Sequence, residues 1–528
     1  MNITDNALIV VRKALEHYNV PVTSKTVTEN LLSHPQYPSL KSICDLFDEL
    51  KIDNYPMRMN KEELFETEAP FIAHLKNSSE KLVFVPSLNR QERVEYFDEV
   101  GKSKIVDEKE FFEQHTGVSV LIDPDENSGE ANYVEKRQSA FIHQGLPYLA
   151  GVGCSLILGY MAILQGIRPN ISPIDASLIF TKLLGMVLST LLIFKGFNIS
   201  NHLVNTLCNF NKKANCNSIL NTKAAKVIGW LHWSDVGLIY FTTNLVMMLS
   251  IPTIGDHTLM AVFSCFILTY VVFSIYYQAA KAKVWCPLCL GVQVIFLVEA
   301  GLYLAYWGAM EWTWIALIKY SGIALTVSFG VMLYKGYVIT RQSAWQEKIA
   351  YLRLKKNPQI FISLLHQGDQ KDFTKTGEVF VTGNPKGRIV ITAFLSLTCT
   401  PCKRAFNQLK ELVDREQIRL DLVFSLNDNE KTFVNLLARG FLNDKPREAI
   451  ELLDRWYNSE GDERKSLMNK TNESVPSDDC FEKLKKVHNG LFNFHKISAT
   501  PTVFVNGHIF PQEYEFKDLA RFIEILDA

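Results

Sequence analysis

The sequence predicts a multi-domain protein in which an α-helical membrane bundle is flanked by two α/β domains. Residues 144–335 are mostly apolar, whereas 1–140 and 341–528 are rich in charge. The apolar segment divides into six runs, each about long enough to cross a bilayer as a helix. Both polar segments alternate between helical and strand patterns. At 528 residues the chain has room for three or four domains.

Residues 1–135 are predicted to form a small mixed α/β domain. NALIVVRKALEHY and SLKSICDLFDELKI have the apolar spacing of helices, and APFIAHL and KLVFVPSL read as strands. A polar linker is expected over 122–138. The first residues, MNITDNALIVVRKALEHY, lack the basic start, apolar stretch and cleavage site of a secretory signal.

The six apolar runs are 144–165, 176–198, 236–251, 257–279, 286–308 and 313–334. They predict a bundle in contact with the lipid bilayer. The third run is short and follows the segment 223–235, which we expect to be an amphipathic helix at the interface. Its apolar residues are Val227, Ile228, Trp230, Leu231 and Trp233. Because a carboxylate is costly in a membrane, Glu299 should face the bundle interior, with a structural or a functional role.

Residues 336–371 are predicted to be a linker with a basic helical start, and 372–528 a second α/β domain. RIVITAFLSL and IRLDLVFSL read as buried strands, and CTPCKRAFNQLKELVD reads as a helix that begins at its first cysteine. A helical insert is expected from about 429 to 492. ATPTVFVNG and a final helix then complete the domain.

Six of the ten cysteines form three close pairs: Cys208 and Cys216, Cys286 and Cys289, and Cys399 and Cys402. The isolated ones are Cys44, Cys154, Cys265 and Cys480, which we interpret as small buried apolar residues. The near balance of 55 basic and 56 acidic residues gives no reason to expect a nucleic-acid partner.

The pair Cys399 and Cys402 has the position of a redox dithiol. A thiolate at a helix N-terminus is stabilised by the backbone N–H groups and the helix dipole, so Cys399 is the expected nucleophile. Cys402 lies one turn later and would resolve a mixed disulfide. A structural zinc is the alternative, but no second ligand pair lies nearby, and we expect no metal.

The order strand, CTPC, helix, and then Thr500-Pro501 before a strand resembles the thioredoxin family, in particular its disulfide-oxidoreductase branch with a helical insert. The resemblance implies that Pro501 is a cis-proline and that Thr500 and Pro501 hold the substrate backbone. Many members have a tryptophan just before the first cysteine, where this chain has Leu397 and Thr398.

The other two pairs, the segment CNSILNTKAAKVIGW and a CPLC motif at the start of a later run resemble the vitamin K epoxide reductase family over about 174–310. The resemblance implies a four-helix quinone-reductase core, with the first and last of the six runs as extra spans. It also implies that menaquinone or ubiquinone accepts the electrons. Thr222 matches the serine or threonine that hydrogen-bonds the quinone, and Cys289 would contact it.

The resemblance implies a relay of electrons through the three dithiols. Cys399 and Cys402 would oxidise thiols of a substrate protein or peptide, and the electrons would pass through Cys208–Cys216 to Cys286–Cys289 and quinone. Disulfide exchange needs one thiolate to reach another sulfur, which suits a loop pair between a soluble and a membrane-embedded pair. A zinc site or a structural disulfide in the membrane segment is the alternative.

LLSHPQYPSLKSICDLFDELKIDNYPM, APFIAHLKN and DEKEFFEQHTGVSVLIDP resemble the cysteine peptidase domain of bacteriocin exporters over about 1–124. That peptidase needs a cysteine at the start of its first helix and a histidine that activates it. These positions fall near Asn6 and Lys81. Cys44 and His74 match other parts of the family. The expectation is a peptide-binding or structural module without proteolysis.

Six spans place both soluble domains and all three dithiols on one side of the membrane. An oxidase belongs on the outer, extracytoplasmic side of the cell (inner) membrane, where disulfides persist, and this is our expectation. The positive-inside rule favours the cytoplasmic side instead. The basic residues that flank spans on the thiol side are Lys136, Arg137, Lys195, Lys212, Lys213, Lys223, Lys226, Lys281, Lys283 and Lys335.

The sequence therefore predicts a membrane thiol oxidase that reduces quinone. One rival is a conduit that carries electrons the opposite way and reduces substrate disulfides, since direction depends on reduction potentials. The other is a peptide-binding accessory of an export system; no P-loop is visible, so the chain is not itself a transport ATPase. No pattern assigns an oligomeric state.

Overall fold

The computed structural model describes residues 6–67, 69–76, 80–86, 93–98, 101–139, 172–196, 220, 222–228, 231–250, 252–304, 311–373, 379–413, 418–442, 445–459 and 478–527. The predicted run 144–165 and the cysteines Cys154, Cys208 and Cys216 lie outside these residues. The domains are described one at a time.

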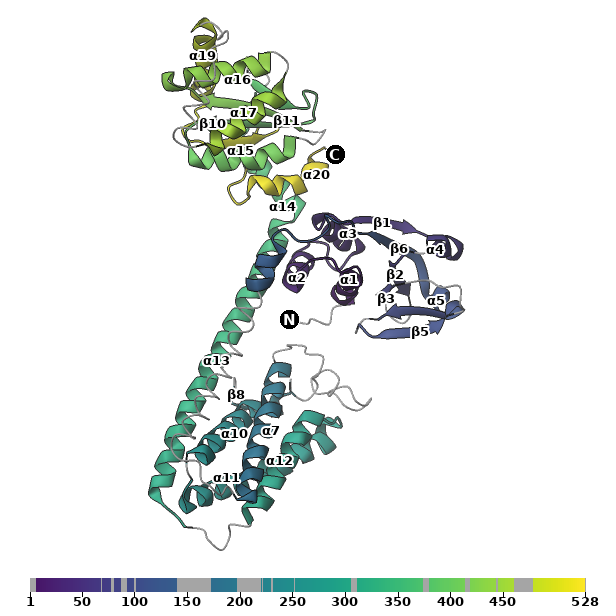
Figure 1. Cartoon of the computed structure of the whole chain (residues 1–528), viewed down its shortest axis with the longest axis vertical. Helices are drawn as coiled ribbons and strands as arrows, with labels where there is room; N and C mark the ends of the chain where they lie inside the picture. The colour runs from purple at the N-terminus through teal and green to yellow at the C-terminus, as the bar shows by residue number, and fades with distance from the viewer. Residues whose placement is uncertain are drawn as a thin grey trace. The chain divides into compact units, whose positions relative to one another are not determined.

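The amino-terminal domain is a six-stranded antiparallel sheet with helices on both faces (Figure 1). The strand order is β1 (Asp53–Arg58), β6 (His115–Asp123), β2 (Phe71–Lys76), β3 (Glu80–Val85), β4 (Arg93–Phe97) and β5 (Ser103–Asp107). The helices are α1 (Asn6–His17), α2 (Ser24–Leu32), α3 (Leu40–Glu49), α4 (Lys61–Thr67) and α5 (Glu108–Gln114).

Successive side chains of the central strands point to opposite faces of this sheet, as strand geometry requires. Ile72 and Phe84 pack against the core formed with α1 and α3. Their neighbours Ala73 and Val85 pack against the core that contains Leu64 of α4. The two faces explain why both strands are almost wholly apolar in the sequence.

The predicted linker 122–138 is only partly a linker, because its first half packs on the domain. The backbone N–H groups of Gly129 and Glu130 donate to the carbonyls of Leu50 and Pro21, at 2.8 and 2.9 Å. Gly129 has φ +141°, and a Cβ there would lie 2.7 Å from Pro21, so the position needs glycine. The first half of the segment is therefore part of the folded domain.

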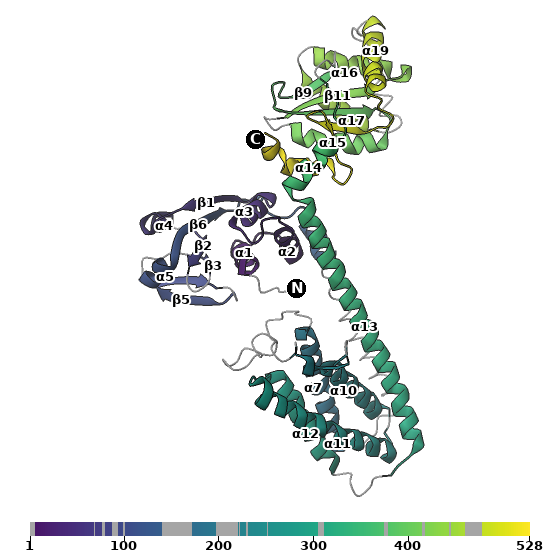
Figure 2. The ribbon, with the colours of Figure 1, turned by 180° about the vertical axis from the view of Figure 1, so that it is seen from behind.

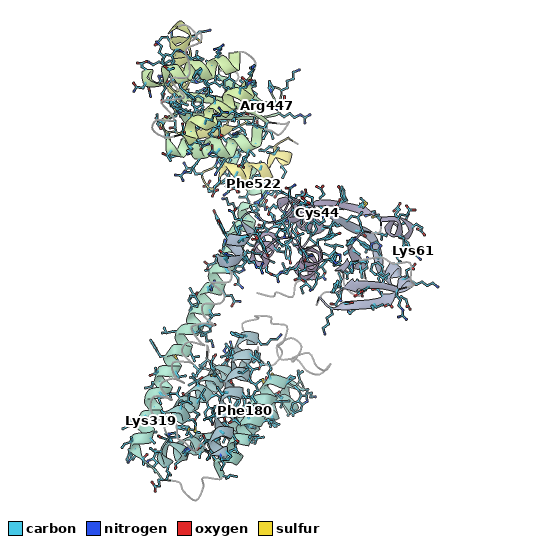
Figure 3. All side chains as sticks on the ribbon, viewed as in Figure 1. Cys44, Lys61, Phe180, Lys319, Arg447 and Phe522 are labelled. Atoms are coloured by element: carbon cyan, nitrogen blue, oxygen red, sulfur yellow. The ribbon has the colours of Figure 1, made fainter. Side chains whose placement is uncertain are left out.

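The apolar segment forms a helical bundle from α7 (Pro173–Gly196), α10 (Trp233–Leu249), α11 (Ile254–Tyr276), α12 (Pro287–Tyr303) and α13 (Trp314–Lys355). Within the described residues, the helices 173–196, 254–282 and 314–355 are long and apolar enough to cross a membrane, and α12 is shorter. Large apolar side chains face outward; Phe180 on α7 is 65 % exposed (Figure 3). Such an apolar exterior belongs in lipid, and the protein is a membrane protein.

The amphipathic helix predicted over 223–235 is wrong. The chain instead forms a short 3₁₀ turn (Lys223–Ala225) and a hairpin of β7 (Lys226–Ile228) and β8 (Leu231–His232). Val227 and Ile228 are β-branched and favour extended backbone. Helix α10 begins only at Trp233, where the Asp235 carboxylate accepts a hydrogen bond from the His232 backbone N–H at 2.8 Å.

Two ion pairs fix the long helix α13 to the bundle. Lys319 contacts Asp256 at the start of α11 at 3.0 Å, and Lys335 contacts Asp235 near the start of α10. The two lysines are about 24 Å apart along the helix axis, close to the thickness of a hydrocarbon core. Helix α13 then continues without a break to Lys355, so the expected basic connector is part of this helix.

The carboxy-terminal domain is a five-stranded sheet in the order β13 (His508–Ile509), β12 (Thr502–Val505), β10 (Ile389–Ser396), β11 (Ile418–Ser425) and β9 (Phe380–Gly383) (Figure 2). Strands β10 and β11 are parallel, and the other pairs are antiparallel. Its helices include α15 (Thr400–Val413), α16 (Lys431–Leu442), α17 (Pro446–Asn458), α19 (Asp478–Phe494) and α20 (Ile523–Asp527).

Helix α14 (Pro358–Gln367) lies in the stretch expected to be a linker, yet it packs into the core of this domain. The Phe361 ring is fully buried and stacks on the Phe522 ring, with centroids 4.3 Å apart. Phe361 and Leu365 are one turn apart on the buried face of the helix. The domain core therefore begins before residue 372.

Candidate redox sites

The pair Cys286 and Cys289 forms the start of α12. Cys286 is the N-cap residue, and its sulfur accepts a hydrogen bond from the Cys289 backbone N–H at 3.3 Å. Pro287 occupies the first turn, where its missing N–H costs nothing. Cys286 is fully buried, whereas Cys289 is partly exposed. The two sulfurs therefore have different surroundings although they are one turn apart.

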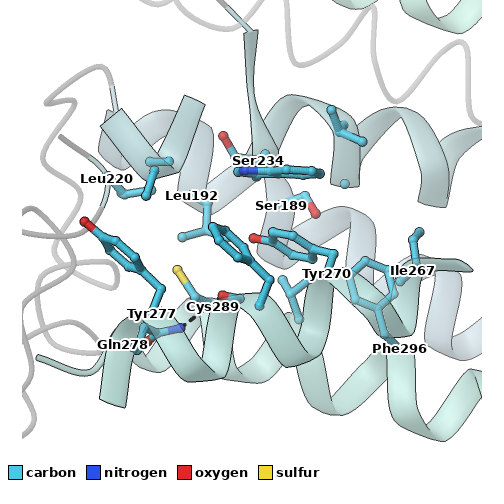
Figure 4. Close-up of a pocket in the computed structure, with 18 of the residues that line it drawn as sticks. Ser189, Leu192, Leu220, Ser234, Ile267, Tyr270, Tyr277, Gln278, Cys289 and Phe296 are labelled. Carbon is cyan, nitrogen blue, oxygen red and sulfur yellow. Dashed lines mark hydrogen bonds between the residues drawn. The ribbon is translucent and has the colours of Figure 1, made fainter. Parts of the chain in front are cut away.

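Cys289 lies on the wall of a cavity within the bundle (Figure 4). Apolar and aromatic side chains from α7, α10, α11 and α12 form most of the wall, including Leu192, Ile267, Val292 and Phe296. Thr222 lies on the same wall, as do Ser234 and Tyr270. A mostly apolar cavity with a few polar groups is typical of a small-molecule site. The two residues predicted to contact a quinone, Thr222 and Cys289, are thus brought together.

A buried polar network, missed in the sequence, holds the backbone of Cys286. The Gln278 side-chain oxygen accepts from the Cys286 N–H at 2.9 Å, and the Gln278 amide donates to the Ser274 hydroxyl at 3.3 Å. Gln293 donates to the same hydroxyl at 2.5 Å. Gln278 belongs to a π-helical turn (Tyr277–Ala282), a feature frequent at functional sites. The sequence signal that could have revealed this network is the presence of polar side chains in otherwise apolar runs.

A buried ion pair crosses the interior of the bundle. Lys182 on α7 and Glu299 on α12 are both wholly buried, with their charged atoms 2.5 Å apart. The Tyr240 hydroxyl donates to the same Glu299 oxygen at 3.0 Å. The Lys182 ammonium also lies 4.9 Å from the centre of the Tyr240 ring. Glu299 faces the interior as predicted; Lys182 was missed, although a lysine inside an apolar run is a clear signal.

The pair Cys399 and Cys402 lies where β10 leads into α15. Cys402 is buried, and its sulfur accepts a hydrogen bond from the Ser396 backbone N–H at 3.3 Å. Cys399 is more exposed, and its thiol lies 3.6 Å from the Thr500 carbonyl oxygen. The Thr500–Pro501 peptide bond is cis. Four residues predicted for the substrate-oxidising site therefore lie together.

The two thiols of this site have different acidities. Partial burial raises the pKa of Cys399, but hydrogen bonds from the Cys402 thiol and backbone N–H and from the Thr500 side chain outweigh it, and the pKa lies below its ordinary value. Burial raises the pKa of Cys402 to about 11. The sulfur of Cys399 is thus the better nucleophile at neutral pH.

Two aromatic residues of the helical insert hold the loop before Cys399. The Trp456 indole donates to the Leu397 carbonyl at 2.9 Å, and the Tyr457 hydroxyl donates to the Ser396 carbonyl at 3.0 Å. Sequence reasoning missed both because their partners are backbone atoms about 60 residues away. The insert therefore fixes the approach to the dithiol.

The amino-terminal domain brings no cysteine to the place of the peptidase nucleophile. Asn6 stands there, and its side-chain amide is bonded in both directions to the Leu82 backbone, at 2.7 and 2.6 Å. Cys44 lies on α3, where burial and the neighbouring carboxylates of Asp48 and Asp45 raise its pKa to about 11. At the position of the peptidase cysteine, the domain therefore has a side chain that hydrogen-bonds the backbone and is not a nucleophile.

We expect Cys399 of the reduced protein to react with iodoacetamide at pH 7 far faster than Cys44. The thiolate is the reacting form; the lowered pKa keeps Cys399 ionised at lower pH than a free thiol, whereas Cys44 needs pH near 11. Peptide mapping of alkylation rates from pH 5 to 9 measures the difference. Equal rates at pH 7 would contradict the assignment.

Comparisons with known proteins agree with this architecture. Residues 176–304 match the vitamin K epoxide reductase family, 375–525 a thioredoxin family, and 1–127 the peptidase C39 family. No protein of the curated set matches.

Three solved structures illustrate the similarities. BdbD from Bacillus subtilis is 15 % identical, with 30 % of this chain and 96 % of that one covered and a TM-score of 0.25. Chlamydia trachomatis DsbA is 20 % identical, with 30 % and 96 % covered and a TM-score of 0.24. The peptidase domain of Streptococcus mutans ComA is 16 % identical, with 16 % and 75 % covered and a TM-score of 0.15.

Together, the two described dithiols and the matched families define a thiol–disulfide oxidoreductase of the membrane. More particularly, the chain joins three parts in the predicted order, which match the peptidase C39 family, the vitamin K epoxide reductase family and a thioredoxin family.

Proposed function

We propose that the protein is a quinone-dependent thiol oxidase that forms disulfides in substrate proteins or peptides. Cys399 and Cys402 take electrons from the substrate, Cys208 and Cys216 receive them next, and Cys286–Cys289 delivers them to the quinone. Cys208 and Cys216 lie outside the described residues, so their place in the relay rests on the family resemblance.

The position of Cys289 carries this proposal. Its side chain lines the apolar cavity, while Cys286 does not, so the two sulfurs of the dithiol serve different partners. The cavity fits a quinone in kind: apolar walls suit a ring with an isoprenoid tail, and hydroxyl groups such as that of Thr222 suit its carbonyls. A bound quinone supplies a two-electron acceptor within the bilayer.

The carboxy-terminal site is arranged for the substrate end of the relay. A substrate thiolate attacks the accessible Cys399 sulfur of the oxidised pair, and the Cys399–Cys402 bond breaks with Cys402 as the leaving thiolate. A second substrate thiol then attacks the substrate sulfur of the mixed disulfide, which forms the substrate disulfide and releases Cys399, whose lowered pKa makes it a good leaving group. Thr500 and Pro501 lie beside Cys399 and hold the substrate backbone there.

In this proposal the chain crosses the membrane several times and presents its dithiols to the extracytoplasmic side. An oxidase suits that side because disulfides persist there, whereas thiols are kept reduced in the cytoplasm. The lysine-rich thiol side argues for the opposite orientation under the positive-inside rule. The amino-terminal domain would bind peptide without cleaving it.

The test mixes the purified full chain, a reduced dithiol peptide and 2-methyl-1,4-naphthoquinone. We expect one quinol to form for each peptide disulfide, measured by quinone absorbance and by thiol titration. Omission of the peptide is the control. Reduction of an oxidised peptide by quinol, with no forward reaction, would establish the reverse conduit instead.

A further inference from the structure

The buried sulfur of Cys402 receives a backbone hydrogen bond from the end of strand β10. Ser396 is the last residue of that strand, and its N–H donates to the sulfur at 3.3 Å. When a thiolate attacks Cys399, the electron pair of the Cys399–Cys402 bond passes to the Cys402 sulfur. Burial raises the pKa of Cys402 to about 11, and the Ser396 N–H is one of the groups that oppose this rise. A fixed donor therefore meets the negative charge as it forms.

Tyr457 holds the Ser396 backbone from the helical insert. Its hydroxyl donates to the Ser396 carbonyl at 3.0 Å, and its ring lies against the Phe406 ring, with centroids 5.4 Å apart. Phe406 is wholly buried on α15, one turn after Cys402. One side chain thus contacts both the strand that carries the donor and the helix that carries the acceptor sulfur.

Trp456 holds the next residue of the same loop. Its indole donates to the Leu397 carbonyl at 2.9 Å, and its ring stacks on Phe433 with centroids 4.0 Å apart. Trp456 is 1 % exposed and Tyr457 is 3 % exposed, so water does not compete for these bonds. Two consecutive side chains of α17 therefore bind two consecutive carbonyls just before the dithiol.

We propose that Tyr457 and Trp456 are positioning residues for disulfide exchange, because they hold the Ser396 N–H toward the Cys402 sulfur. The attacking sulfur bonds to Cys399, the Cys399–Cys402 bond breaks, and Cys402 leaves as a thiolate that later takes a proton. Neither aromatic side chain gains or loses an electron or a proton in this step. The inference deepens the proposed function and rests on it in taking Cys399 as the attacked sulfur.

The experiment follows the opening of the oxidised Cys399–Cys402 pair by glutathione, with the full-length protein in lipid nanodiscs and no quinone. Acid quenching, alkylation and peptide mapping of free Cys402 give the initial rate constant. Tyr457→Phe keeps the ring against Phe406 but removes the donor to Ser396. We expect the rate constant to fall about three- to tenfold, the effect of one hydrogen bond.

A second measurement separates this effect from a general loosening of the loop. The alkylation rate of Cys399 in reduced Tyr457→Phe should equal that of the wild type. The hydrogen bonds that lower the pKa of Cys399 come from Cys402 and Thr500, which the variant leaves in place. A loosened loop would instead change the alkylation of Cys399 and the opening of the disulfide together.

Two further variants complete the test. Trp456→Phe removes the indole donor and should lower the rate constant less, since Leu397 is one residue further from the Ser396 N–H. Tyr514→Phe is the matched control, because Tyr514 is 7 % exposed and its ring packs on Phe361 of α14; the rate constant should not change.

The outcomes distinguish the inference from the proposed function. An opening rate in Tyr457→Phe equal to that of the wild type would overturn the inference alone. An equal fall in the alkylation rate of Cys399 would also overturn it alone. A wild-type disulfide that glutathione opens by attack on Cys402, with the mixed disulfide found there, would overturn the proposed function of this pair as well.

Discussion

Replacing Cys289 with alanine is expected to lower quinone reduction by about 10³-fold or more, as removal of a reacting nucleophile does. Cys289 is the sulfur of its pair on the cavity wall, and Cys286 is wholly buried behind it. Without Cys289 the pair cannot form its disulfide, so electrons that enter the chain have no route to the quinone. The rate of quinol formation with a reduced dithiol peptide measures the loss.

The same variant should still oxidise substrate once. Cys399 and Cys402 are on another domain and keep their chemistry, so a single turnover should leave them reduced, as thiol counting by mass spectrometry would show. Cys265→Ala is the matched control, because Cys265 is an isolated, exposed cysteine on α11 and should leave the rate unchanged. Sustained quinone reduction by Cys289→Ala would refute the relay.

Local patterns predicted much of the fold because they are set by nearby residues. The predicted strand, dithiol and helix around Cys399 correspond to β10 and α15, since a buried apolar run and an N-terminal helix signal are both short-range features. The CPLC motif likewise lies at the start of a helix. Thr222 and Cys289 were named for one site, and both line one cavity. Their contact with a quinone stays a prediction.

The features that sequence reasoning missed depend on distant partners. Strands β7 and β8 pair with each other, although the apolar spacing of this stretch also suits a helix. Helix α14 was predicted to be part of a linker, because the sequence alone does not show that the ring of Phe522 stacks on the ring of Phe361. The roles of Ser274 and Gln278 were also missed, because they depend on a hydrogen bond to the start of the next helix. Periodicity reports which face is apolar but not what covers it.

The pair Lys182 and Glu299 shows that the free-energy cost of a buried charge also depends on a distant partner. Each residue alone is costly in an apolar bundle, and only their contact makes either acceptable. The sequence predicted that Glu299 turns inward, but the counter-charge lies more than a hundred residues earlier. The pair also joins α7 to α12, the two helices that carry Leu192 and Cys289 to the cavity.

Glu299→Gln is expected to lower the free energy of unfolding by about 3 to 5 kcal/mol, the usual effect of removing one partner of a buried ion pair. Glutamine keeps the shape of the side chain and an acceptor for the Tyr240 hydroxyl, so packing changes little. What it removes is the counter-charge of the wholly buried Lys182 ammonium. Unfolding of the purified protein in mixed micelles, followed by circular dichroism, measures the change.

Two companion variants separate charge from packing. Glu311→Gln makes the same chemical change at an exposed carboxylate in the described part of the loop before α13, and it should alter the free energy of unfolding by less than about 0.5 kcal/mol. Lys182→Met combined with Glu299→Leu removes both charges, and it should recover most of the stability, since an apolar pair of similar volume often replaces a buried ion pair without loss. A double variant as unstable as Glu299→Gln alone would contradict the prediction, because removal of both charges would then bring no recovery and the uncompensated Lys182 charge could not be the cause.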